Sequence, residues 1–403
     1  MLKKLVIACL TNFLIAALMG LLLRYSVIGT MRFNYRFLTH AHSHVAMLGW
    51  VYLMLYVLIV NYFVPKQKPI YTKLFWLTEF AVVGMMLSFP FQGYAAVSIS
   101  FSTLHIFCSY YFAYLVWKHH KTTSTASLYL LKTALVFMVL STFGVWCLGP
   151  AVSTQGPASA FYQIAIQFFL HFQFNGWFLI AVFALLCYVF QVQHSKQFKA
   201  FCVLVLVSTI STLALPIYWF VPYDTLFYVN AVGVVLQIPM LAVFLRLLKP
   251  KAAIVFQNQP KLLQYIFGFA LACLVLKAFL QMLTLVPEFS KTAFAYHNFV
   301  LGFIHLLMLG TVSGFLLFFM LKNHWLAPNK LLAFGVFGFM LGFVLTEAIL
   351  AYQGYLYYTK SGMMPYYTKS LFLSSLLLPV GIVSIIINVL KTKNYGQKTI
   401  ETP

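Results

Sequence analysis

Long apolar runs separated by short polar segments account for almost the whole chain. Each run is close to the roughly 20 residues that a helix needs to cross a bilayer core. The runs fall at 5–27, 40–63, 74–96, 98–117, 127–149, 159–192, 200–220, 226–248, 263–286, 296–321, 329–353 and 369–391. The pattern therefore predicts an all-α integral membrane protein with about twelve transmembrane helices in one domain, 1–403.

Composition supports lipid as the surrounding solvent. Of the 403 residues, 63% are hydrophobic and only 8% are charged, and a soluble protein of this size could not cover so much apolar surface. The six cysteines are scattered through apolar runs without CxxC spacing, so neither a zinc site nor a disulfide framework is indicated.

The basic residues predict an orientation. Lys and Arg outnumber Asp and Glu by 26 to 5, which in a soluble protein would suggest nucleic acid, but in a membrane protein reflects topology. With the N-terminus inside, the inner segments hold Lys3, Lys4, Lys66, Lys68, Lys73, Lys118, Lys121, Lys196, Lys199, Arg246, Lys249, Lys251, Lys261, Lys322, Lys330, Lys391, Lys393 and Lys398. The outer loops hold Arg24, Arg32, Arg36, Lys291, Lys360 and Lys369. This excess predicts a bacterial-type inner (cytoplasmic) membrane protein with both termini in the cytoplasm and no nucleic-acid partner.

Seven of the eleven histidines share the outer half of the membrane in this topology. They are His40, His42, His44, His105, His171, His297 and His305. Imidazole is a favoured ligand for iron and copper, and a neutral ring enters lipid more easily than a carboxylate does. Metal or heme ligation explains both the residue type and the shared depth. The alternative is that each histidine only hydrogen-bonds two helices together.

Spacing separates these histidines into faces. His42 and His44 lie about 200° apart around a helix and could address two different cofactors, whereas His40 and His44 share a face. His297 and His305 are roughly 12 Å apart along the axis and are not expected to bind one iron.

Two short segments echo each other. "HVAMLG" at 44–49 and "HLLMLG" at 305–310 both place glycine five residues after histidine, where a flat macrocycle or another helix could approach the backbone. Three charges inside apolar runs, Glu79, Lys277 and Glu347, are further functional candidates because a charge near mid-membrane is costly.

The histidine-bearing second, sixth and tenth spans resemble those of subunit I of the heme-copper oxidase superfamily, which includes nitric oxide reductases. "HSHVAMLGW" is similar to the His-x-His-(x)4-Gly-Trp pattern of family ligand helices. "HFQFNGWF" at 171–178 resembles the sixth-helix motif of nitric oxide reductases, with Asn175 at the position of an acidic residue. The resemblance implies a bundle of three four-helix arcs.

The resemblance also implies roles for individual residues. His44 and His305 would be the axial pair of a low-spin heme b, and His171 would be the sixth-helix ligand of a second metal. His42 on the opposite face of its helix could serve a second heme, and His40 could hold a propionate or cap its helix. Arg32 and Arg36 suit heme propionates.

The chain also departs from the family pattern. The seventh span contains none of the family's adjacent histidines, and position 303 is Phe where a high-spin heme ligand is expected. A three-histidine copper site is therefore incomplete, and His171 would need help from His105 or His297. Whether the chain turns over O2 or NO, and which residues would be catalytic, is left open.

The resemblance implies one or two hemes b, with copper or non-heme iron as open alternatives. Its expected partners are membrane lipid, a cytochrome c or quinol electron donor, O2 or NO, and small partner subunits. Three other functions stay open: a transporter or channel, a nitric-oxide-response membrane protein that shares the "HAH" motif at 40–42, and a structural subunit.

Overall fold

The computed structural model describes residues 1–64 and 68–392, and all regular structure in these residues is helical. Twelve helices in this part of the chain are long and apolar enough to cross a membrane, so the predicted fold class is confirmed. The arrangement in three arcs stays a prediction. Lys66, Lys393 and Lys398, which were assigned to the inner side, lie outside the described residues.

The first six spans pair neatly with the predicted runs. They are α1 (Leu2–Tyr25); α2 (Tyr35–His44), η1 (Val45–Tyr52) and α3 (Leu53–Phe63); α4 (Pro69–Gln92); α5 (Ala96–His119); α6 (Thr125–Gln155); and α7 (Ala160–His171), η2 (Phe172–Phe178) and α8 (Leu179–Val189).

The remaining six spans also correspond to predicted apolar runs. They are α9 (Lys196–Ser211) and α10 (Ala214–Tyr218); α11 (Asp224–Phe256); α12 (Lys261–Met282) and η3 (Leu283–Leu285); α14 (His297–His305), η4 (Leu306–Val312) and α15 (Ser313–Lys322); α16 (Lys330–Tyr358); and α17 (Tyr367–Ser375) and α18 (Leu377–Lys391). A short helix, α13 (Pro287–Ala295), lies in the loop before the tenth span.

Local sequence explains several helix ends. The side chains of Asn34, Ser159 and Asn329 accept hydrogen bonds from backbone N–H groups in the first turns of α2, α7 and α16. α6 and α11 run several residues past their predicted ends and continue through Pro150 and Pro250. Proline is tolerated there because neighbouring groups in membrane proteins can satisfy the carbonyl that it frees.

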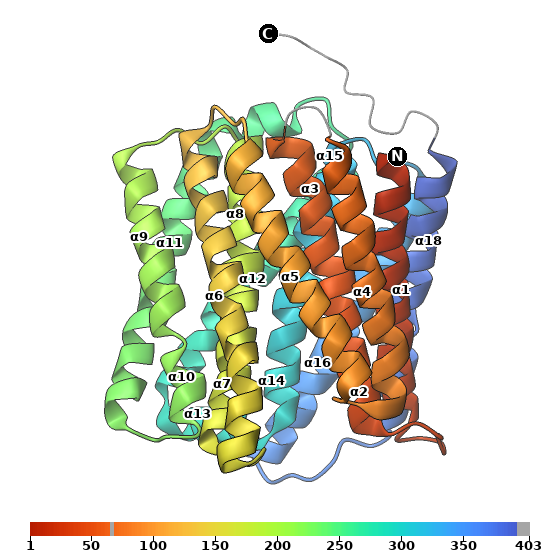
Figure 1. The fold of residues 1–403 in the computed structure, drawn as a ribbon, viewed down its shortest axis with the longest axis vertical. Helices are drawn as coiled ribbons and strands as arrows, with labels where there is room; N and C mark the ends of the chain where they lie inside the picture. Colours follow the sequence, from red (N-terminus) through yellow and green to blue (C-terminus); the bar gives the residue numbers. More distant parts are fainter. Residues whose placement is uncertain (65–67, 393–403) are drawn as a thin grey trace.

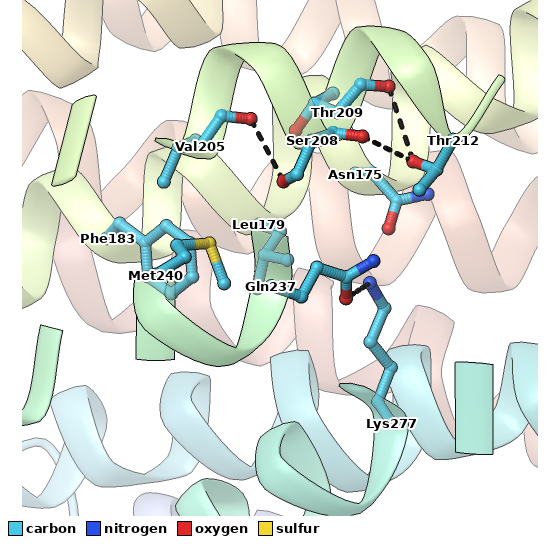
Figure 2. Close-up of a pocket in the computed structure, with 10 residues that line it drawn as sticks. All are labelled: Asn175, Leu179, Phe183, Val205, Ser208, Thr209, Thr212, Gln237, Met240 and Lys277. Carbon is cyan, nitrogen blue, oxygen red and sulfur yellow. Dashed lines mark hydrogen bonds between the residues drawn. The ribbon is translucent and has the colours of Figure 1, made fainter. Parts of the chain in front are cut away.

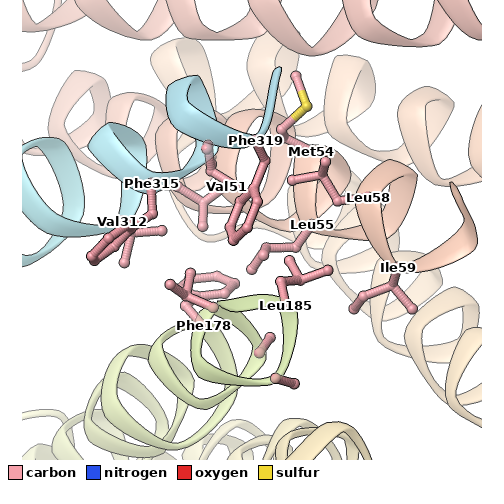
Figure 3. Packing of buried hydrophobic residues seen from close by; sticks show 14 of the residues in the cluster. Val51, Met54, Leu55, Leu58, Ile59, Phe178, Leu185, Val312, Phe315 and Phe319 are labelled. Carbon is pink, nitrogen blue, oxygen red and sulfur yellow. The ribbon is translucent and has the colours of Figure 1, made fainter. Parts of the chain in front are cut away.

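The second, sixth and tenth spans form the centre of the bundle. In the most apolar part of each, 83% of the residues are buried, against 33–44% in the other spans of the described chain. α3 packs against both α8 and α15, and η2 packs against η4. Figure 3 shows where the three helices meet around Val51, Leu55, Phe178, Leu185, Val312, Phe315 and Phe319.

The first and last spans close the bundle. α1 packs against α18, and Lys3 Nζ donates hydrogen bonds to the carbonyl oxygens of Leu390 (2.8 Å) and Thr392 (3.1 Å). The start of α1 and the end of α18 therefore lie at the same end of the molecule, at the top of Figure 1.

Candidate cofactor site

Each of the three central helices changes its winding directly after a histidine. His44, His171 and His305 end regular α-helices, and π-helical segments η1, η2 and η4 follow them. π-Helical geometry is rare and is frequently found at functional sites. Three such segments at equivalent places mark these histidines as a related set.

A glycine follows each of these histidines at the same distance. Gly49, Gly176 and Gly310 stand five residues after His44, His171 and His305, so the echo noted between two spans extends to all three. A β-carbon on these glycines would lie 2.7–2.9 Å from atoms of neighbouring helices. Of the two readings open from the sequence, the described contacts favour close helix packing at these glycines.

Polar side chains support the π-helical segments. Asn12 Nδ2 donates to the Gly49 carbonyl (3.1 Å) and to Glu79 Oε2 (2.8 Å). Ser313 Oγ donates to the Met308 carbonyl (2.8 Å) and accepts from Trp50 Nε1 (2.8 Å). Glu79 therefore has a structural partner, and the second and tenth spans are tied together beside their histidines.

His42 and His44 point to opposite faces of α2, as their spacing predicts. His42 Nδ1 donates to the Ala16 carbonyl of α1 at 2.8 Å. The His44 ring stacks on Phe89 of α4, with ring centres 4.4 Å apart. His40 packs on the same side as His44, against Tyr94 (4.8 Å), so the shared face of His40 and His44 is also confirmed.

His305 makes a hydrogen bond to an intramembrane carboxyl group. Its Nδ1 lies 3.1 Å from Glu347 Oε1 of α16, and both side chains are less than one-fifth exposed. His42 is within electrostatic range of His305 and of Arg24, and Arg24 is within range of Glu347. Of His42 and His44, His42 is the one that interacts electrostatically with His305.

Arg24 was not singled out from the sequence. It stands at the end of α1 and donates a hydrogen bond to Ser375 Oγ of α17. Its only sequence signal is its place as the last cation of an apolar run. Arg32 and Arg36, in contrast, are exposed between α1 and the first turn of α2, and Arg36 is within electrostatic range of His40.

A cavity of 770 Å³ lies beside His171, between α7, α10, α12, α14 and α16. Its lining is mostly apolar, with a few polar groups that include Asn175, Glu347 and Trp219. Phe303 faces it from α14. This volume falls in the range of roughly 300–1,000 Å³ that is usual for small-molecule and cofactor sites.

His171 has one ring nitrogen engaged. Its Nε2 lies 2.7 Å from the Thr209 carbonyl of α9, so Nδ1 is the nitrogen left for another partner. His297 is exposed at the start of α14, and His105 is buried against Tyr52, with ring centres 4.7 Å apart. Within residues 1–64 and 68–392, no three His, Cys, Asp or Glu side chains come close enough to hold a metal ion.

A second, smaller cavity adjoins the first at Asn175 and Thr212. At 20 Å³ it has room for one water molecule, which needs about 10–15 Å³ by this measure. Figure 2 shows Lys277 pointing toward Gln237, and its Nζ donates to Gln237 Oε1 at 3.2 Å. Lys277 also lies 5.9 Å from the centre of the Phe303 ring.

His105, a candidate from the sequence, has two buried neighbours, Tyr52 and Trp177, that the sequence did not indicate. Tyr52 Oη, His105 Nε2 and Trp177 Nε1 have no hydrogen-bond partner among the described residues. The Tyr52 ring contacts both His105 and Trp177. Sequence offers no signal for this cluster, because the three residues come from three different spans.

The described residues thus form a bundle with twelve helices that are able to span a membrane, and histidines lie on its three central spans. No protein-family model matches the chain, and a search of curated proteins finds no significant match.

Proposed function

We propose that the protein is a heme-binding membrane protein of the respiratory type, with one bis-histidine low-spin heme b that transfers electrons. The observation that carries this proposal is that His42 of the second span and His305 of the tenth span are each hydrogen-bonded through Nδ1, which leaves Nε2 of both rings for iron. Bis-histidine coordination of iron needs two imidazoles from facing helices, and the second and tenth spans supply them.

The hydrogen bonds of His42 and His305 fit axial ligation. Metal-bound histidines usually donate the second ring nitrogen to a carbonyl or a carboxylate. His42 Nδ1 bonds the Ala16 carbonyl and His305 Nδ1 bonds Glu347, so Nε2 of each ring is the nitrogen available to iron. His44 has the same arrangement, with Nδ1 on the His40 carbonyl, but faces α4.

We therefore favour His42 and His305 as the axial pair. The assignment of His44 to this place, expected from the resemblance to heme-copper oxidases, stays a prediction. Gly20 leaves space for the His42 ring, because a β-carbon at position 20 would lie 3.0 Å from His42 Cε1. Arg24 is in range to meet a propionate, since guanidinium binds carboxylates with two hydrogen bonds. Arg32 and Arg36 stay candidates for the same role at the outer end.

The heme would supply one-electron chemistry, in which its iron cycles between the ferric and ferrous states. The chain's own part is to hold the two imidazoles, exclude water and set the charge around them. Arg24, His42, His305 and Glu347 come from four different spans, so packing of the bundle fixes their geometry.

The 770 Å³ cavity is the proposed site of a second component that binds O2 or NO. His171 Nδ1 is the candidate ligand there. The described residues do not fit the three-histidine copper site of the superfamily, because His171 is not joined by two other histidines. Turnover of O2 or NO, a cytochrome c or quinol donor and small partner subunits belong to this proposal as expectations from the resemblance.

We also infer that the end holding the N-terminus is cytoplasmic and that the protein resides in an inner membrane. The helix ends on that side carry Lys118, Lys196, Lys261 and Lys330, in line with the excess of basic residues on cytoplasmic sides.

The test is a reduced-minus-oxidised visible spectrum of the purified protein, with pyridine hemochrome and metal analysis. We expect a sharp low-spin heme b signal that is lost in His305→Ala and in His42→Ala. His194→Ala, on an exposed residue, is the control and keeps the signal.

His44→Ala separates the two assignments. If it keeps the signal while His42→Ala loses it, His42 is the ligand. If His44→Ala loses the signal while His42→Ala keeps it, His44 is the ligand. A heme signal that survives all three substitutions contradicts ligation by this pair.

Transport is the second candidate, and the combination of a large cavity with the buried Lys277 favours it. Wild-type protein that holds no heme after expression with ample heme supply would support transport and contradict the heme proposal.

A further inference from the structure

Glu347 holds a negative charge against the histidine that we assign to iron. Its Oε1 lies 3.1 Å from His305 Nδ1, and the two residues come from neighbouring spans α16 and α14. An ionisable side chain at this depth is costly in a membrane, so its placement needs a compensating interaction.

Gly302 provides the space for the second carboxylate oxygen. It precedes His305 by three residues and therefore lies on the same side of α14. A β-carbon at this position would lie 3.0 Å from Glu347 Oε2. The absence of a side chain at 302 thus lets the carboxylate reach the imidazole.

Arg24 approaches this carboxyl group from the end of α1. It is within electrostatic range of Glu347 and is itself anchored on Ser375 of α17. The His305 ring therefore has a fixed partner in Glu347 that is separate from any iron.

The two proposed ligands differ in the group that accepts the hydrogen bond from Nδ1. His42 Nδ1 bonds a neutral backbone carbonyl, whereas His305 Nδ1 bonds a carboxylate. A hydrogen-bonded carboxylate increases the basicity of a ligating imidazole, and a more basic ligand favours ferric over ferrous iron.

We propose that Glu347 is a positioning residue for His305: it orients the imidazole and lowers the reduction potential of the iron bound to it. Gly302 is the residue that makes this contact possible. This inference rests on the proposed heme function.

The experiment is a redox titration of the purified heme protein at one fixed pH, followed by the visible spectrum. Glu347→Gln keeps an oxygen that can accept the hydrogen bond but removes the charge. We expect the ferrous-to-ferric ratio at a given applied potential to rise about tenfold, which is about 59 mV for one electron.

Glu79→Gln is the matched control, since Glu79 is an intramembrane carboxylate that bonds Asn12 and not a histidine. Its potential should equal that of the wild type. Gly302→Ala keeps both Glu347 and His305 but displaces the carboxylate, so its potential should rise in the same direction.

A Glu347→Gln protein with bound heme and an unchanged potential overturns the proposal. Should Glu347→Gln fail to retain heme, Gly302→Ala decides: a raised potential supports the role of Glu347, and an unchanged one overturns it. Wild-type protein without any heme signal is a different result, because it contradicts the proposed function itself.

Discussion

At the scale of single residues, the sequence predicts faces better than partners. The 200° between His42 and His44 follows from helix geometry alone, and the contacts with α1 and α4 confirm that they point apart. The neighbours of each face depend on which helices pack side by side. For this reason the sequence could not find the hydrogen bond of His305 to Glu347 or the approach of Arg24.

Lys277 illustrates how a buried charge depends on its partner. It is 5% exposed and bonds the amide oxygen of Gln237. Gln237→Leu should lower the free energy of unfolding by about 1–3 kcal/mol, because it leaves the ammonium group without its acceptor. Lys277→Met should also cost about 1–3 kcal/mol, because it leaves the buried amide oxygen of Gln237 without its donor, whereas replacing both partners by apolar side chains should be nearly neutral.

The measurement is thermal unfolding of the detergent-solubilised variants and of the double variant. The Lys277→Met/Gln237→Leu protein should regain most of the stability lost in Gln237→Leu. Simple addition of the two single effects would mean that the residues do not interact.

At the scale of helices, the apolar runs predict where the spans are but not how they are wound. The centres of the second, sixth and tenth spans are buried on nearly all sides, so their sequences carry little periodicity that could reveal a π-helical turn. The repeated His-x-x-Met-Leu-Gly pattern points to two of the π-helical segments, η1 and η4. The third segment, η2, is recognised only in the folded structure, where it packs against other helices.

Glycine substitutions test this packing. Gly176→Ala would place a β-carbon 2.7 Å from the Phe137 ring and should cost about 1–3 kcal/mol of stability. Gly268 on α12 has open space around it, so Gly268→Ala should be neutral or slightly stabilising. Thermal unfolding of both variants checks this, and equal effects would argue against tight packing at Gly176.

At the scale of the whole molecule, alternation of twelve spans follows from the sequence because lipid imposes the length of each helix. The positions of the two cavities do not follow from the sequence. They arise where the side chains of several spans fail to fill the space between them. The candidate site is therefore only partly predictable: its histidines can be found in the sequence, but the cavity beside them cannot.

Reporter fusions test the proposed orientation. Alkaline phosphatase fused after Lys391 should be inactive and a fluorescent protein at the same point should be bright, because the proposed orientation puts that end in the cytoplasm. Phosphatase inserted in the loop between α16 and α17 should be active. The opposite pattern would invert the topology.

The contact between α1 and α18 has a consequence for the order of the chain. Because Lys3 bonds the backbone at Leu390 and Thr392, the two ends of the described polypeptide are neighbours in space. The order in which the helices follow one another could thus begin elsewhere: a circular permutant that joins the present ends and opens the chain in another loop at the same end would keep the same neighbours around every helix.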